Sequence, residues 1–470
     1  MQSWMFLSSF EKLRNTFLHN YIIDSMLHLG PRTFDELSGE VVQNTAFVLT
    51  KPHDPYGGIT LSEVKALPDE EKAEWKRRFM EDADKDLNDW LVGGAKGTYY
   101  RLVDGKNCAD KEQLFLSHKK GNEDGNLIYY SNVEQKNFEK IPGCPIGYWF
   151  NEAFLDLYES KMVSDVAIGK NGITTSDNDT FLRLWDEVSF NGIKFKRTKN
   201  SMQKTDKWIP YNKAGGKRRW YGNLDYVINW ENNGSAIKNL RDEKGKKLAS
   251  VRNESYYFKE ALSWSDIKSN GTSFRYYPNG LIFDASANTA YVNNEKDMYS
   301  VLSIANSKVM DMFAEFYNPG IHFKIGNFYN VPYPISENDK VAFAEMARQN
   351  ISISKQDWDS HETSWDFQGN ELLTIDEQTY KENINNFVEQ HYEETGERLD
   401  IDSSLPDSNS LAWRVEQYKQ KWEHKFMQLH KNEEELNRRF IDIYGLQDEL
   451  TPDVPLDEIT ILQQGEISIE

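Results

Sequence analysis

The first fifty residues alternate between apolar and polar positions in the way that a helix and two strands do. Apolar side chains spaced three and four apart predict a helix over 10–17, and the apolar runs over 22–29 and 41–49 predict strands. A helix followed by two strands is how a doubly wound α/β sheet ends. We therefore expect residues 1–50 to be the remnant of such a sheet, whose nucleotide-binding glycine loop would lie further upstream.

The pattern then changes twice before residue 335. Residues 51–95 are charged, and Pro68 followed by acidic and then basic residues predicts the start of a helix. From 96 to 335 short aromatic and β-branched runs, such as 98–103 and 273–277, predict strands, and a helical pattern lies at 299–316. A charged helical insertion over 51–95 and a mixed, β-rich domain over 96–335 follow from these patterns.

The last part of the chain, 336–470, is predicted to be helical and acidic. Its clearest signal is one apolar stripe along a helix expected at 412–444, with Gly445 suited to the position just after the helix. The stripe consists of Val415, Tyr418, Trp422, Phe426 and Leu429. Together the patterns predict an α+β, multidomain protein: a sheet remnant, a β-rich domain and a helical C-terminal region.

Composition narrows the class of protein. The chain has 470 residues and abundant aromatic side chains, so it can bury several cores. Its two cysteines make neither a disulfide framework nor a zinc site, and its nine histidines show no ligand spacing. It has no run of eighteen apolar residues and no signal-peptide pattern. We expect a cytoplasmic, metal-free protein without a membrane partner.

The net charge of −20 is distributed unevenly. Residues 1–335 carry 43 Lys and Arg against 44 Asp and Glu, whereas residues 336–470 carry 12 against 31. The acidity therefore belongs to the C-terminal region, and the remainder can present a basic face to a polyanion.

A basic stretch with interleaved aromatic rings, residues 194–221, is the strongest local signal for nucleic acid. It contains ten basic residues and one acid, Asp206. Lysine and arginine neutralise phosphates, and flat rings stack on bases. The alternative is a solvated loop whose tryptophans pack in the core. The candidate DNA-binding residues here are Lys194, Lys196, Arg197, Lys199, Lys207, Trp208, Tyr211, Lys217, Arg218, Arg219, Trp220 and Tyr221.

Several segments resemble the C-terminal part of the PglX family, large adenine-specific DNA methyltransferases of BREX phage-defence systems. The most specific is NEEELNRRFIDIYGLQDELTP over 432–452. The resemblance covers nearly the whole chain, and its other segments are 4–14, 24–32, 39–49, 96–103, 142–149, 175–185, 207–213, 219–222, 306–308, 318–326 and 331–332. It implies that 1–50 close the methyltransferase sheet and that 96–335 form the DNA target-recognition domain.

The sequence departs from this family at the chemistry. Adenine methyltransferases grip the flipped adenine with an Asn/Asp-Pro-Pro-Tyr/Phe loop, and this sequence contains no such tetrapeptide. Asn318-Pro319-Gly320 lacks the second proline and the ring. The glycines at 93–97 follow no buried strand and read as a linker rather than as an S-adenosylmethionine loop. We therefore expect no catalytic or cofactor-binding residue in this chain. The chain alone should be inactive, and S-adenosylmethionine should be bound only by the complete enzyme.

Three polar residues before a predicted turn, Asp177, Asn178 and Asp179, are candidate readers of base edges. Asparagine can bond adenine through two hydrogen bonds, and aspartate can accept from cytosine. An equally good interpretation is a helix N-cap in front of 181–185.

The expected partners are double-stranded DNA, the missing N-terminal methyltransferase half, and other defence proteins that bind the acidic C-terminal region. Two alternatives remain open from sequence alone. The chain could be a DNA-specificity subunit without enzymatic work, or an acidic scaffold whose basic stretch is merely solvated.

Overall fold

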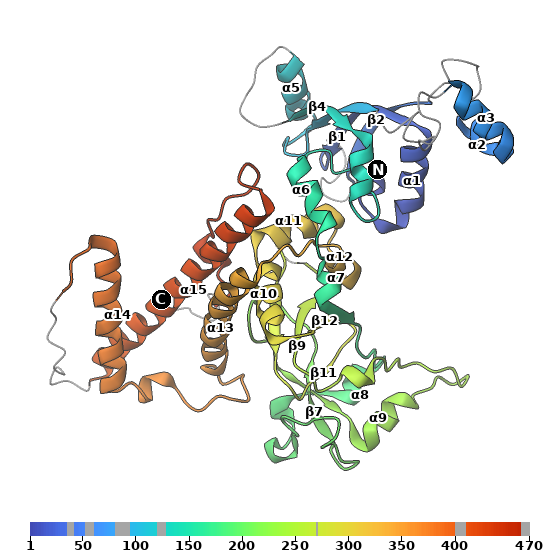
Figure 1. Cartoon of the computed structure of the whole chain (residues 1–470). Coiled ribbons are helices and arrows are strands. Elements are labelled where there is room, and N and C mark those ends of the chain that lie inside the picture. The colour runs from blue at the N-terminus through green and yellow to red at the C-terminus, as the bar shows by residue number, and fades with distance from the viewer. Residues whose placement is uncertain are drawn as a thin grey trace. The chain divides into compact units, whose positions relative to one another are not determined.

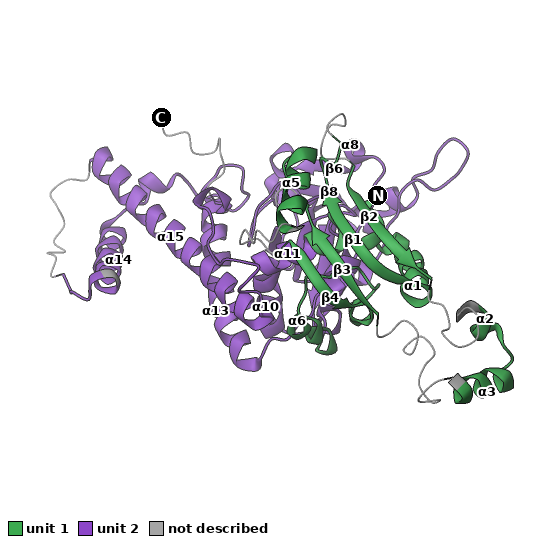
Figure 2. Ribbon diagram, turned by 90° about the horizontal axis from the view of Figure 1, so that it is seen from above, with its two compact units in different colours: residues 1–161, 315–319 green, residues 162–314, 320–470 purple. Residues whose placement is uncertain are grey.

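The computed structural model describes residues 1–34, 42–51, 61–79, 95–119, 128–268, 271–399 and 410–461 (Figure 1). These residues form two compact units. Unit 1 comprises residues 1–161 and 315–319, and unit 2 comprises 162–314 and 320–470 (Figure 2). Both units combine helices with small sheets, so the α+β, multidomain class expected from the sequence is confirmed at this level.

Unit 1 is built on one four-stranded sheet of order β2-β1-β3-β4. The central strand β1 runs antiparallel to β2 and parallel to β3, and β3 runs antiparallel to β4. The sheet is therefore mixed. Its strands are β1 (Ile22–Gly30), β2 (Asn44–Thr50), β3 (Lys96–Arg101) and β4 (Tyr129–Glu134).

This sheet does not end at residue 50, where the sequence placed the end of the sheet remnant. Ser25–His28 of β1 pairs with Thr98–Arg101 of β3, across the segment expected as an insertion. Gly97 allows the two strands to approach, because a Cβ at this position would lie 2.5 Å from the Ile23 carbonyl oxygen. The compact units thus divide at 161, and the boundary expected at 95 falls beside a strand of the same sheet.

Unit 1 also contains helices and a cluster of aromatic rings. Tyr99 of β3 is fully buried and stacks on Tyr148, with ring centroids 4.8 Å apart. The helix expected after Pro68 is present. The helices are α1 (Glu11–Asn20), α2 (Leu61–Ala66), α3 (Asp69–Phe79), α5 (Cys108–Lys119) and α6 (Glu152–Asp156).

Unit 2 contains two further four-stranded sheets, of order β10-β9-β12-β5 and β11-β7-β8-β6. The strands are short, as the broken aromatic runs predict. They are β5 (Ala167–Lys170), β6 (Leu182–Leu184), β7 (Trp208–Asn212), β8 (Tyr226–Asn229), β9 (Ala261–Ser265), β10 (Phe274–Tyr277), β11 (Ile282–Phe283) and β12 (Ala287–Val292).

Short helices connect these strands, and longer ones follow them. The short helices are α7 (Val163–Val166), α8 (Asn178–Phe181), α9 (Glu231–Lys238) and α12 (Ile325–Tyr329). The longer ones are α10 (Glu295–Ala305), α11 (Lys308–Tyr317), α13 (Glu337–Asp359), α14 (Glu377–Thr395) and α15 (Leu411–Tyr444).

The long helix predicted at 412–444 is confirmed as α15. Ser410 caps its first turn by accepting a hydrogen bond from the Trp413 amide. Gly445 ends it with a φ of +63°, a conformation that glycine adopts without strain. The second half of α15 is the more deeply buried, through Leu429, Leu436 and Phe440 among others.

The helix predicted over 299–316 is two helices, α10 and α11. The break lies at Asn306, whose side-chain amide accepts a hydrogen bond from the Phe274 amide at 2.8 Å and donates one to the Phe274 carbonyl at 3.0 Å. This pairing holds the C-cap residue of α10 to the first residue of β10. The apolar periodicity continues across the break, which is why the sequence pattern shows a single helix.

Among the helices of the described residues, we find none that is long and apolar enough to cross a membrane.

Candidate nucleic-acid interface

The basic stretch 194–221 lies entirely in unit 2, and its centre is strand β7. This strand runs antiparallel to β8. The backbone amide of Lys194 donates a hydrogen bond to the carbonyl of Trp208, the first residue of β7, at 2.8 Å. The stretch therefore divides into an outer part, 194–207, and an inner part, 208–221. The two parts differ sharply in exposure.

The outer part carries the exposed cations. The side chains of Lys196, Lys199, Lys204 and Lys207 are exposed, and that of Lys194 is half-buried. Arg197 instead pairs with the buried Asp206 carboxylate at 3.1 Å, which fixes the loop onto the sheet. Asp206, the one acid of the stretch, thus stabilises the loop between Arg197 and itself, and the exposed lysines lie in the same part of the chain.

Most aromatic residues of the inner part are core residues. Tyr211, Trp220 and Tyr221 are buried, whereas Trp208 is half-buried with the Lys207 ammonium 5.5 Å from its ring. Burial and the neighbouring Asp284, which accepts the Tyr211 hydroxyl at 2.7 Å, raise the pKa of Tyr211 well above its ordinary value. Burial likewise raises the pKa of Tyr221 to about 12. Three of the four rings therefore cannot stack on bases in this conformation.

Arg218 and Arg219 are also buried, and each is held by an acid of the C-terminal helices. Arg218 donates to Asp357 of α13 at 2.5 Å and to the Ser354 carbonyl at 3.1 Å. Arg219 donates to Glu433 of α15 at 3.0 Å. Burial opposes the charge of Arg219, but the carboxylates of Glu433 and Asp311 raise its pKa above the ordinary value.

Trp220 completes this internal junction. Its indole nitrogen donates to the other carboxylate oxygen of Glu433 at 2.7 Å, so Glu433 serves two neighbouring residues of the stretch. Arg218 and Arg219, which the sequence predicts to bind phosphate, are therefore paired with carboxylates inside the protein. Lys217 is half-buried beside them, and burial together with Arg219 lowers its pKa.

The loop before these arginines is shaped by glycine and by Arg275. Arg275 is fully buried and donates to the carbonyls of Gly216, Arg218 and Ala214 at 3.1 to 3.2 Å. Gly222 has a φ of +125°, and a Cβ there would lie 2.4 Å from the Arg218 Nε. The loop is therefore internally bonded, and Gly216, around which a Cβ would meet nothing within 4 Å, is its open point.

The candidate base readers lie at the start of α8, directly before β6, a strand of the sheet that contains β7. Asp177 is the N-cap of α8, where its carboxylate accepts the Thr180 amide at 3.0 Å. Hydrogen bonds from the Thr180 side chain and then from the Thr180 amide lower the pKa of Asp177. Asn178 accepts from the Thr175 hydroxyl at 2.5 Å, and Asp179 is exposed. Asp177 is therefore a helix N-cap, as predicted, but it caps the single turn Asn178–Phe181, and the segment predicted to be helical over 181–185 contains strand β6 instead. Base reading by these three residues stays a prediction.

The sequence predicts a linker at the glycines of 93–97, of which residues 93 and 94 lie outside the described residues. Lys96 and Gly97 begin β3, so this part of the segment leads into a strand. A cofactor loop of a methyltransferase leaves a strand and enters a helix. Here the strand follows the glycines, and the linker interpretation stays a prediction.

Comparison with known proteins finds two adenine-specific methyltransferases that are similar to this chain. No protein-family model matches the chain. The adenine-specific methyltransferase PglX of Lacticaseibacillus casei (strain Zhang) is 36% identical over 465 residues, covering 97% of this chain and 32% of that protein. The adenine-specific methyltransferase BrxX of Escherichia coli O9:H4 (strain HS) is 34% identical over 375 residues, covering 79% and 26%.

A solved structure, that of the type IIG restriction endonuclease BpuSI, aligns with 74% of this chain and 41% of the other at 10% identity. Its TM-score of 0.26 is too low to indicate a shared fold. The relationship rests on the sequence identities instead. The chain spans about a third of the length of the curated relatives it matches, and over that length it belongs to the PglX family of adenine-specific methyltransferases.

Proposed function

We propose that this chain is the DNA-recognition and C-terminal portion of an S-adenosylmethionine-dependent, adenine-specific DNA methyltransferase of a BREX phage-defence system. The supporting observation is identity above a third, along 97% of the chain, to a protein named for adenine methylation. The sequence has no Asn-Pro-Pro-Tyr loop. In this proposal methyl transfer depends on a methyltransferase segment that carries this loop and the cofactor site.

The proposed DNA contact is made by the outer lysines of the basic stretch. Lys196, Lys199 and Lys207 are exposed around β7, where they can reach phosphates without any rearrangement of the core. Arg218, Arg219, Trp220 and Tyr221 are left out of the proposed contact surface, because burial and ion pairs with α13 and α15 engage them. Their role in the proposal is to fix the recognition strands to the C-terminal helices.

The test of DNA binding is a salt titration with a short fluorescent duplex. Each phosphate contact contributes a slope of about −0.9 to log K against log salt, so the triple variant K196Q/K199Q/K207Q should flatten the slope by about 2 to 3. The matched control is K381Q/K419Q/K431Q, which removes the same charge from the acidic helices α14 and α15. Equal binding by the two variants would exclude the proposed contact.

Methylation is tested separately with labelled S-adenosylmethionine. The chain alone should transfer no methyl group, and a co-expressed segment carrying the cofactor loop and Asn-Pro-Pro-Tyr should restore adenine methylation of duplex DNA. Methylation by the isolated chain would contradict the proposal. DNA binding without any restoration would instead favour a DNA-specificity subunit.

A protein-binding role of the acidic helices is a second candidate, supported by exposed apolar side chains on them. Phe387 and Tyr392 of α14 are 56% and 53% exposed, among residues that are otherwise mostly polar. Exposed aromatic residues on a charged surface are typical of contacts with other proteins. Co-purification with the other proteins of the defence system, lost in F387A/Y392A, is the expected result.

A further inference from the structure

A second basic segment, residues 241–259, follows α9 in unit 2. It contains six basic residues and three acids, in a chain that is strongly acidic as a whole. No aromatic rings interleave with its first lysines, so it lacks the signal that marks 194–221. Its basic residues are Arg241, Lys244, Lys246, Lys247, Arg252 and Lys259.

The first half of this segment is a tight, bonded hairpin. Arg241 and Lys247 pair antiparallel, and Gly245 turns the chain with a φ of +77°. The Asp242 carboxylate accepts the backbone amides of Lys244 and Lys246 at 2.9 and 2.8 Å. Asp242 therefore holds the turn. In Figure 1 the chain beyond α9 extends away from the strands as a narrow loop.

The base of the hairpin lies beside the candidate base readers. The Leu248 carbonyl accepts the Ser176 hydroxyl at 2.9 Å, and Thr174 and Ser250 exchange two backbone bonds at 2.9 and 2.8 Å. Asn253 continues the contact by donating to the Asn171 carbonyl at 2.8 Å. Residues 248–253 thus run along 171–176, which lead directly into α8. The hairpin that carries the lysines is therefore hydrogen-bonded to the segment 171–176, which precedes Asp179.

Further cations line the continuation of this ribbon. The ammonium groups of Lys170 and Lys259 both lie over the ring of Tyr256, 4.8 and 4.9 Å from its centroid. Two like charges at one ring repel each other, and an anion between them would relieve the repulsion. Arg252 and Lys324 line a neighbouring cavity of about 390 Å³, with Asn171 and Asn288 among its other walls.

Two nearby acids are already engaged with other groups. Asp266, which also lines the cavity, contacts the His322 imidazole at 2.7 Å, and Glu254 pairs with Lys238 at 2.7 Å. Within the part of the chain that the structure describes, no carboxylate lies within 4 Å of a cation of the following set. These are Lys170, Lys244, Lys246, Lys247, Arg252, Lys259 and Lys324.

We propose that the second basic segment, with Lys170 and Lys324, binds the phosphate backbone of duplex DNA. This inference rests on the proposed function and adds a second contact surface to it. The cations are spread along one ribbon from the hairpin tip to the cavity, which suits a polyanion with successive phosphates rather than one compact ligand. Phosphate contacts position a protein on the duplex and carry no sequence information of their own.

Two variants test the two ends of this surface in the full chain. K244Q/K246Q/K247Q removes the hairpin lysines, and K170Q/K259Q removes the pair over Tyr256. The first should weaken binding of a duplex at moderate salt and flatten the slope of log K against log salt by about 2 to 3, and the second by about 1 to 2. The loss should be the same on duplexes of unrelated sequence.

The control K381Q/K419Q/K431Q matches the hairpin variant in net charge. An unchanged midpoint of urea unfolding shows that each variant folds. We expect this for the hairpin variant, because its three lysines are exposed at a turn. If the chain binds duplex DNA but the hairpin variant behaves like the control, the second surface is excluded and the proposed function stands. If the unaltered chain binds no duplex at low salt, both proposals are overturned.

Discussion

Arg219 and Glu433 are 214 positions apart in the sequence and form a buried ion pair of 3.0 Å. Arg219 stands at the end of the basic stretch, and Glu433 lies in the second half of α15. Glu433 also accepts the indole N–H of Trp220, so one carboxylate fixes two adjacent residues. The basic stretch and helix α15 are therefore joined through buried side chains within unit 2.

Glu433→Gln tests how much this pair contributes to stability. The amide keeps the size of the side chain but leaves Asp311, 3.6 Å away, as the other carboxylate at ion-pair distance from Arg219 among the described residues. Breaking a buried pair by removing one partner typically costs several kcal/mol, and we expect a loss of about 3 kcal/mol in the free energy of urea unfolding.

The matched control for that change is Glu393→Gln. Glu393 pairs with Lys431 at 2.8 Å, but both side chains are about two-thirds exposed. An exposed pair contributes little, so we expect Glu393→Gln to change the free energy of unfolding far less than Glu433→Gln does. If the two substitutions cost the same, the junction at Glu433 is not an energetic link between strand and helix.

Two glycines of the same loop should respond differently to alanine. At Gly222, where φ is +125°, a Cβ would lie 2.4 to 2.6 Å from the Arg218 side chain and disturb its pair with Asp357. We expect Gly222→Ala to cost about 2 kcal/mol in urea unfolding. Gly216→Ala meets nothing within 4 Å and should change little. Equal effects would show that backbone strain at Gly222 is small.

Local signals in the sequence were sufficient for some of these features. The stripe along 412–444 and Gly445 define α15, because apolar periodicity and a C-terminal glycine act within a few residues of each other. The cap at Asp177 was visible for the same reason. The strand runs at 22–29 and 273–277 were also predicted, since each is bounded by turn residues.

The burial and ion pairs of Arg218 and Arg219 could not be predicted from the sequence, because their partners are distant in the chain. Asp357 and Glu433 lie 139 and 214 positions beyond Arg218 and Arg219. A basic run that binds phosphate and one that pairs with buried acids have the same composition. The second basic segment was missed for the opposite reason: its lysines lack neighbouring aromatics, although a charge count over 241–259 would have found them.

His28 should make unit 1 sensitive to acid. It is buried, and burial together with Arg101 and Lys111 lowers its pKa to about 3, from an ordinary value of 6.5. Between these values the unfolded chain binds the proton and the folded chain does not. Stability therefore rises with pH through this window and is lost as the pH falls from 6.5 toward 3.

We expect this histidine to contribute a loss of about 2 kcal/mol in the free energy of unfolding between pH 7 and pH 5. His28→Gln removes the titrating group and can keep a hydrogen bond to the Tyr148 hydroxyl, which lies 2.9 Å from the imidazole. The variant should lose less stability over the same interval. An identical pH dependence in both proteins would contradict a buried, neutral His28.

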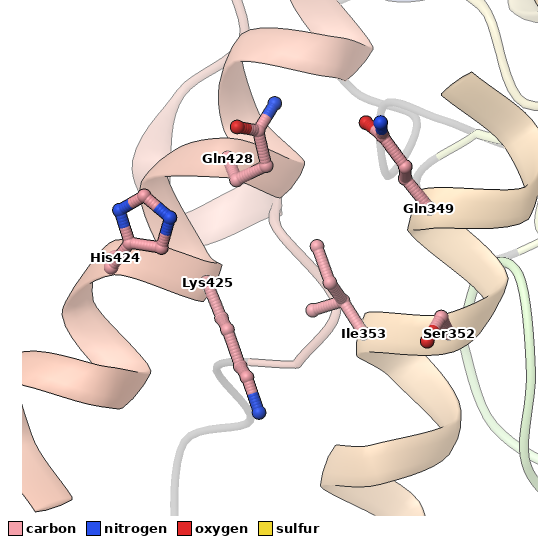
Figure 3. A pocket seen from close by; sticks show the side chains of 6 residues that line it. All are labelled: Gln349, Ser352, Ile353, His424, Lys425 and Gln428. Atoms are coloured by element: carbon pink, nitrogen blue, oxygen red, sulfur yellow. The ribbon is translucent and has the colours of Figure 1, made fainter. Parts of the chain in front are cut away.

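A pocket of about 340 Å³ lies between α13 and α15, and Figure 3 shows Lys425 and His424 of α15 across from side chains of α13. Burial, and then the charge of Lys421, lower the pKa of Lys425 to about 8. Its ammonium donates to Gln356 at 2.5 Å and lies 4.8 Å from the Trp422 ring, with no carboxylate of the described residues at ion-pair distance.

A lysine of this kind should be acylated at a lower pH than an ordinary one, because only the neutral amine reacts. Brief labelling over a range of pH, read by peptide mass spectrometry, should give a midpoint near pH 8 for Lys425 in the folded chain. In the urea-unfolded chain the same residue should return to about 10.4. Lys421→Gln should raise the folded midpoint only in part, since burial is the larger cause. A folded midpoint equal to that of the unfolded chain would show that water reaches the Lys425 amine freely and that the two helices do not enclose it.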